Sequence, residues 1–67
     1  MGDTTEIRNR LQRVYASIVM FEKLLDVVDS GRDDPDIWRA GDKILLDIGS
    51  HLQMIAEDVE RYYDNSA

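Results

Sequence analysis

The sequence predicts an all-α protein, an antiparallel two-helix hairpin that dimerises into a four-helix bundle. Three observations lead to this prediction. Apolar residues recur at alternating steps of three and four along two long segments, which is the spacing of helices that pack side by side. One short break, rich in aspartate, separates the segments. The chain has 67 residues, too few for a single hairpin to bury all its apolar surface.

The first helix is predicted over residues 4–29. Asp3 can serve as its N-cap, and Glu6, three residues later, can complete a capping box. No residue from there to Asp29 breaks a helix. The apolar seam of this helix consists of Ile7, Leu11, Val14, Ile18, Phe21, Leu25 and Val28.

The break at residues 30–34 predicts a tight turn within a single domain, 1–67. Gly31 suits the left-handed position just past a helix end. Asp34 followed by Pro35 is typical of an N-cap and a first helical residue. Because the connection is so short, the two helices must run antiparallel.

The second helix is predicted over residues 35–63, followed by a frayed tail at 65–67. One register brings the two seams together, in which the numbers of facing residues add up to about 66. Gly41 then sits among Phe21, Leu25 and Trp38, where a larger side chain has little room. The seam of this helix consists of Trp38, Gly41, Leu45, Ile48, Leu52, Ile55, Val59 and Tyr62.

Apolar residues outside the seams predict that the hairpin has a partner. The run from Ile18 to Phe21 is apolar on every side of its helical turn, and such a turn is normally buried on every side. We expect a second copy to cover this surface, which gives a homodimer. A different protein is the alternative cover, and both can hold. The remaining off-seam residues are Leu24, Val27, Ile37, Ile44, Leu46, Met54 and Tyr63.

Charge and composition exclude several classes of function. The chain carries 14 acidic and 8 basic residues, a net charge of −6, which argues against direct binding of nucleic acid. It has no cysteine, so disulfides and thiolate metal sites are excluded. No apolar run approaches the ~18 residues of a membrane span. We therefore expect a cytoplasmic protein that binds neither nucleic acid nor membrane.

His51 is the one histidine, with Asp47 four residues before it and Ser50 beside it. Neighbours along one helix cannot converge as nucleophile, base and orienting group. One imidazole and one carboxylate are too few to hold a metal ion. We therefore predict no catalytic residue, no metal site, no cofactor and no enzymatic activity, and interpret His51 as a surface or interface residue paired with Asp47.

The turn carries the densest charge of the chain, and its spacing does not match a calcium-binding loop. It is interpreted either as a solvated turn with a helix cap or as an acidic tip that docks on a basic surface. Trp38 follows this turn directly and could form part of an interface. The candidate partner-binding residues are Asp33, Asp34, Asp36, Trp38, Met20, Met54 and Tyr63.

Parts of the second helix resemble two families of small helical hairpins. Trp38, Lys43, Leu45, Ala56 and Asp58 resemble the type III secretion co-chaperones that help hold the needle subunit. A second set resembles the phage family of cyclic-nucleotide sponges, although the ligand-lining tyrosine and lysine of that family's first helix are not reproduced. Because the two resemblances are equal and exclude each other, the chain is assigned to neither family. The second set is Trp38, Ala40, Lys43, Leu46, Gly49 and Ala56.

Together these features favour a small acidic interaction protein that binds a protein partner and inhibits or stabilises it. An inhibitor, an anti-activator and a co-chaperone belong to this class, as do phage-encoded antagonists of host systems. One alternative is an oligomeric sponge that holds a small ligand such as a nucleotide near Arg39, Lys43 and Tyr15. The other is a purely structural helical bundle.

Overall fold

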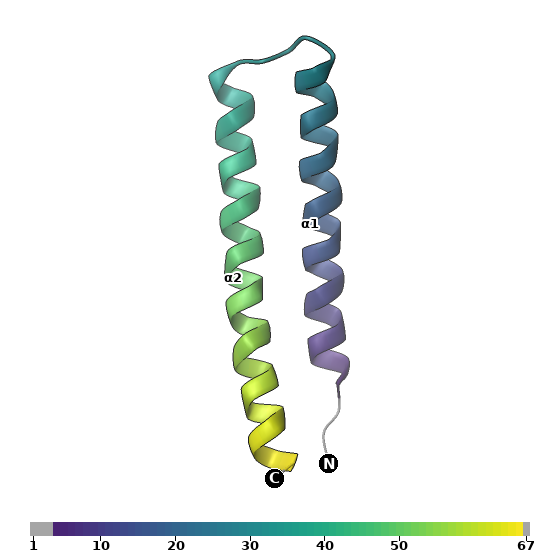
Figure 1. The fold of residues 1–67 in the computed structure, drawn as a ribbon, viewed down its shortest axis with the longest axis vertical. Helices are drawn as coiled ribbons and strands as arrows, with labels where there is room; N and C mark the ends of the chain where they lie inside the picture. The colour runs from purple at the N-terminus through teal and green to yellow at the C-terminus, as the bar shows by residue number, and fades with distance from the viewer. Residues whose placement is uncertain (1–3, 67) are drawn as a thin grey trace.

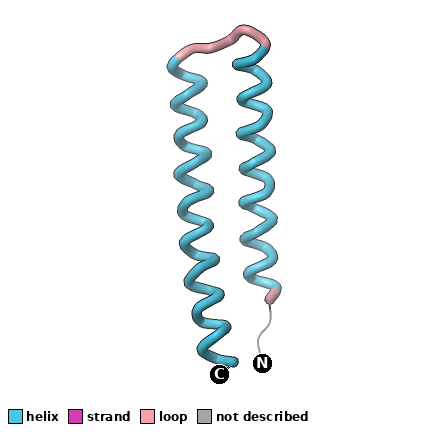
Figure 2. Tube along the Cα trace, viewed as in Figure 1, coloured by secondary structure: helices cyan, strands magenta, loops and turns pink. Residues whose placement is uncertain are grey.

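The computed structural model describes residues 4–66, which form two helices, α1 (Thr5–Asp29) and α2 (Pro35–Ser66). The helices run side by side in opposite directions, so that the start of α1 and the end of α2 lie at one end of the molecule (Figure 1). A short turn at the other end joins them (Figure 2). The predicted helical hairpin is confirmed.

The turn begins with the glycine cap that the sequence predicts. Gly31 has a φ of +111°, a conformation that costs glycine little. The N–H of Gly31 donates to the carbonyl of Val28 at 3.0 Å, and that of Arg32 donates to the carbonyl of Val27 at 3.3 Å. These two bonds satisfy carbonyls left open at the end of α1 and define a Schellman motif.

The predicted N-cap of α2 is also confirmed. The carboxylate of Asp34 accepts hydrogen bonds from the backbone N–H groups of Asp36 at 3.0 Å and Ile37 at 3.2 Å. At the start of α1, Thr4 occupies the N-cap position without a side-chain capping bond. The predicted cap, Asp3, lies outside the described residues.

The helix bounds differ slightly from the prediction at two ends. α1 starts at Thr5 rather than residue 4. α2 continues to Ser66, beyond the predicted end at residue 63. No glycine or proline follows Tyr63, so the sequence contains no residue that stops the helix there.

One row of each predicted seam faces the other helix, and the prediction for the second row is wrong. Tyr62, which continues the facing row of α2, is 37% exposed. Ile7, Val14, Phe21 and Val28 face α2 as predicted, and Gly41, Ile48 and Ile55 face α1. The residues predicted between them are exposed instead, and their places are taken by the residues that precede them. These are Arg10, Ser17 and Leu24 in α1, and Ile37, Ile44, His51 and Asp58 in α2.

Each helix is therefore rotated about its own axis relative to the prediction, and the predicted and observed seams share one row of residues. The row Ile7, Val14, Phe21 and Val28 can be completed in two ways. The residues four positions on are Leu11, Ile18 and Leu25, all apolar, whereas those three positions on are Arg10, Ser17 and Leu24. Periodicity therefore allows two seams that share one row. In the folded hairpin, Arg10 pairs with Asp58 across the helices, and this pair lies only in the second seam.

The predicted register is confirmed to within a helical turn. A Cβ atom built at Gly41 would lie 3.2 Å from Cε2 of Phe21 and 3.7 Å from Cδ1 of Leu24. Ser17 lies opposite Asp47, and Arg10 opposite Asp58. Gly41 thus meets Phe21 as expected, with Leu24 in the place predicted for Leu25.

The interior of the hairpin is small. Val14 and Ile37 are its buried apolar side chains, 7% and 9% exposed, and no side chain among the described residues is fully buried. The molecule measures 52 × 15 × 11 Å. A domain of this size gains little stability from so thin a core.

Candidate functional site

Seven large apolar side chains gather on one side of the hairpin. Each follows directly on a residue that faces the other helix, so each points about 100° away from that residue and lies on one flank of the interface. Because the helices run antiparallel, the same turn brings both rows to the same side of the molecule. We call this surface the apolar face, and it consists of Leu11, Ile18, Leu25, Trp38, Leu45, Leu52 and Val59.

The apolar face is open to solvent in the single hairpin. Its side chains are between 37% and 50% exposed. Tyr63, four residues after Val59, extends the α2 row and is 72% exposed. An apolar surface that runs along both helices is unusual on a soluble monomer.

A second, smaller apolar surface lies on the opposite side, beside the turn. It is a shallow hollow, lined by Leu24, Val27, Ile37 and Ala40, with Arg32 and Asp36 at its rim. We call it the turn hollow. In the sequence, Leu24, Val27 and Ile37 stand out only as apolar residues off the predicted seams. Their position within two helical turns of the break is the one signal that they lie together.

The two candidate methionines lie on the same side of the hairpin as the turn hollow, Met20 nearer to it and Met54 toward the other end. Met20 is seven residues before Val27 and so lies in line with it along α1. Met54 belongs to the same flank, where its sulfur accepts a hydrogen bond from Nη1 of Arg10 at 3.2 Å. The structure therefore separates the predicted partner-binding residues: Trp38 and Tyr63 lie on one side, Met20 and Met54 on the other.

The three candidate aspartates all have contacts within the hairpin. Asp33 accepts a hydrogen bond from Nε1 of Trp38 at 2.6 Å, which fixes the orientation of the indole. Asp34 caps α2 and lies 3.5 Å from Nε of Arg32. Asp36 pairs with Arg39 at 3.2 Å.

The turn nevertheless remains strongly acidic. Residues 26–39 carry five aspartates and two arginines. Their net charge is therefore −3, half of the −6 of the whole chain. This region gives the end of the molecule that holds the turn hollow a negative potential, which attracts a basic partner.

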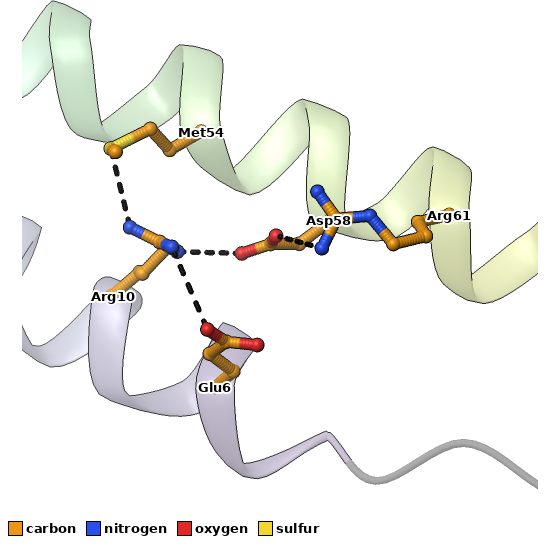
Figure 3. Close-up of polar contacts among 5 residues, drawn as sticks. All are labelled: Glu6, Arg10, Met54, Asp58 and Arg61. Carbon is orange, nitrogen blue, oxygen red and sulfur yellow. Dashed lines mark hydrogen bonds and ion pairs between the residues drawn. The ribbon is translucent and has the colours of Figure 1, made fainter.

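A polar cluster joins the helices near the other end (Figure 3). Nε of Arg10 lies 2.6 Å from Oδ2 of Asp58, whose side chain is only 7% exposed. Glu6 lies 3.8 Å from the same guanidinium, and Arg61 lies 3.5 Å from the second oxygen of Asp58. The buried carboxylate of Asp58 is thus held between two arginines.

The histidine pairs with Asp47 as predicted, and α1 adds a third member. Nε2 of His51 lies 3.5 Å from Oδ2 of Asp47, and Ser17 donates to the same oxygen at 3.4 Å. Nδ1 of His51 is buried without a hydrogen-bond partner among the described residues. Because hydroxyl and imidazole bind the same carboxylate oxygen, the imidazole is not placed to activate the hydroxyl.

Two further observations concern ligands and membranes. Within residues 4–66, no three histidine, aspartate or glutamate side chains lie close enough together to hold a metal ion. The described part of the chain also contains no helix that is long and apolar enough to span a bilayer.

The residues named for a nucleotide sponge do not converge within one hairpin. Arg39 is engaged with Asp36, and Tyr15 lies on α1 near the level of residue 50, about two turns along α2 from Lys43. Compared with known protein families, curated proteins and solved structures, the chain matches none.

Proposed function

We propose that this chain is a small, acidic, non-enzymatic cytoplasmic protein that binds another protein and inhibits or stabilises it. We further propose that it acts as a homodimer, a four-helix bundle built from two hairpins. One observation carries the proposal: the hairpin has two separate apolar surfaces on opposite sides, the apolar face and the turn hollow. Each surface has its own role.

The apolar face supports self-association. A compact monomer of this mass exposes about 4,300 Å², whereas this hairpin exposes 5365 Å². The excess is about 1,000 Å², enough for the ~800 Å² that each partner contributes to a standard interface. A second hairpin would supply apolar contacts in addition to those between α1 and α2, where polar residues such as Arg10, Ser17 and Asp58 interrupt the apolar seam.

The turn hollow supports binding of a different protein. It is large enough for an apolar side chain of the partner. Met20 and, farther from the turn, Met54 lie on the same side of the hairpin, where they can adapt to irregular contacts. The surrounding charge of −3 would speed the approach of a basic surface and disfavour acidic competitors. Occupying a site on the partner would then block it, as in an inhibitor or anti-activator, or shield it, as in a co-chaperone.

Affinity capture with matched variants tests this proposal. Val27→Glu places a charge in the turn hollow, whereas Leu46→Glu changes a residue that is 75% exposed on the side of α2 away from α1. We expect a host protein with a basic surface to be retained by the wild type and by Leu46→Glu and lost with Val27→Glu. Its retention should fall as salt is raised.

Two results would contradict the proposal. Recovery of the chain alone would leave a structural bundle as the better description. A rise in melting temperature of several degrees with one nucleotide would favour the ligand sponge.

A further inference from the structure

The α1 row of the apolar face has a symmetric layout. Ile18 lies at its centre, with Leu11 seven residues before it and Leu25 seven residues after it. An identical helix that runs antiparallel across Ile18 therefore meets this row with a matching row. Leu11 of one copy lies against the partner's Leu25, and Ile18 lies against the partner's Ile18.

The α2 row has its own centre at the same level of the hairpin. It falls between Leu45 and Leu52, which are the two middle residues of the row. The hydrogen bond from Ser17 to Asp47 places the neighbourhood of Ile18 level with residue 47, within a helical turn of that centre. One twofold axis can therefore pass through the middle of both rows at once.

The charges along this side of α1 are complementary under the same axis. Arg8 lies near the start of the helix on the side of the apolar face, and Asp29 ends it on the same side. Antiparallel pairing across Ile18 puts Arg8 against the partner's Asp29, twice in the dimer. α1 has no basic residue in its last turn, so Asp29 is unfavourable there in a single hairpin.

We infer that a second copy of this chain covers the apolar face in an antiparallel arrangement, with a twofold axis at Ile18. This inference rests on the self-association in the proposed function and specifies its geometry. α1 then packs on the partner's α1, and α2 on the partner's α2. The turn of each hairpin lies beside the open end of the other.

The competing twofold arrangement stacks the hairpins with both turns at one end. α1 would then pack on the partner's α2, and the net charge of −3 around each turn would lie beside an equal charge. Like charges brought together in this way disfavour the arrangement. The antiparallel arrangement separates the two turns by most of the 52 Å length of the hairpin.

The antiparallel dimer has a consequence for binding. Its two turn hollows face outward on opposite sides and lie at opposite ends of the bundle. Each can therefore hold a partner without obstructing the other. The arrangement assigns the dimer two independent sites for the proposed protein partner.

Cysteine cross-linking tests the geometry in a chain that has no cysteine of its own. Under mild oxidation, Ile18→Cys should form a covalent dimer, because the two sulfurs meet at the axis. Leu11→Cys alone should not, because its two copies lie about 20 Å apart along the bundle. A mixture of Leu11→Cys and Leu25→Cys should give the mixed covalent dimer.

A second mixture of cysteine variants detects the competing arrangement. Ile18→Cys with Leu45→Cys should cross-link between copies only if α1 packs on the partner's α2. That result, or an unlinked Ile18→Cys, would overturn the inferred axis. Sedimentation of the wild-type chain is read separately: a monomer would overturn the proposed self-association itself, whereas a dimer with the wrong cross-links overturns only the geometry.

Charge reversal gives an independent measurement without cysteine. Arg8→Glu should raise the dimer dissociation constant about tenfold, since two ion pairs become two repulsions. Adding Asp29→Arg should restore the wild-type value. Arg13→Glu, on the opposite flank of α1, is the matched control and should leave the constant unchanged. Equal effects of Arg8→Glu and Arg13→Glu would contradict the inferred pairing.

Discussion

The inner seam, the set of residues through which α1 and α2 face each other, is less apolar than the apolar face beside it. The inner seam contains Arg10, Ser17, His51 and Asp58 among its apolar residues, whereas the apolar face consists entirely of large apolar side chains. The seam therefore specifies how the two helices meet. The apolar face holds most of the hydrophobic surface from which stability can be gained.

In the proposed dimer, this contrast makes the hairpin one half of the core of a four-helix bundle. Buried polar pairs tend to fix a register without adding much stability, and few apolar side chains of the seam are buried. A protein arranged this way becomes stable when its apolar face is covered. In the proposed dimer, folding and association would be one event, so stability would depend on protein concentration.

The largest expected effect comes from breaking the apolar face. Leu52→Asp should abolish the dimer at micromolar concentration and reduce helicity, since burying one carboxylate in each copy costs about 3 kcal/mol or more. Sedimentation and circular dichroism measure both changes. Leu46→Asp, on the exposed back of α2, is the control, and an equal loss in both variants would contradict the contrast.

Breaking the inner seam should lower the free energy of unfolding by somewhat less than breaking the apolar face. Asp58→Ala leaves Arg10 without its partner across the helices, and we expect a loss of about 2–3 kcal/mol in the free energy of unfolding, because Arg10 is partly hydrated. Chemical denaturation measures this loss. Arg39→Ala, which breaks the exposed pair with Asp36, should change stability by about 0.5 kcal/mol or less.

A double variant sharpens this result. Arg10→Met with Asp58→Leu should recover at least the wild-type stability, as apolar side chains replace a buried ion pair. A double variant as unstable as Asp58→Ala would mean that the pair itself stabilises the hairpin.

Removing the N-cap of α2 should lower the free energy of unfolding by less than breaking the inner seam. Asp34→Ala removes the acceptor for two backbone N–H groups, and the expected loss is about 1–2 kcal/mol. This cap starts α2 in the rotation that turns Ile37 inward. Asp29→Ala, which removes a charge at the unfavourable end of α1, should be neutral or slightly stabilising in thermal melts of a monomeric variant.

The smallest expected changes in stability come from substitutions at the two glycines of α2, Gly41 and Gly49. In a monomeric variant, Gly49→Ala should stabilise the hairpin by up to ~1 kcal/mol, because alanine is the better helix former and its Cβ would meet nothing within 4 Å in the single hairpin. Gly41→Ala places a Cβ 3.2 Å from Phe21 and should gain less. Thermal melts of both variants measure the difference, and equal gains would show that Phe21 moves aside freely.

Several features of the fold follow from the sequence alone. The three-four apolar spacing determines two helices, and Gly31, Asp34 and Pro35 determine where the turn lies. These signals are local, because a helix cap or a left-handed glycine depends on neighbouring residues only. The antiparallel register also follows from the sequence, since so short a turn leaves no other way to align the seams.

The rotation of each helix about its axis was decided only in the tertiary structure. The row Ile7, Val14, Phe21 and Val28 belongs to two possible seams. Apolar spacing favours the seam completed by Leu11, Ile18 and Leu25, whereas the folded hairpin uses the other, in which Arg10 pairs with Asp58 across the helices. That choice moves Leu11, Ile18 and Leu25 outward and gathers Leu24, Val27 and Ile37 into the turn hollow. Periodicity along one helix determines which residues share a face, but only packing between helices determines which face becomes the core.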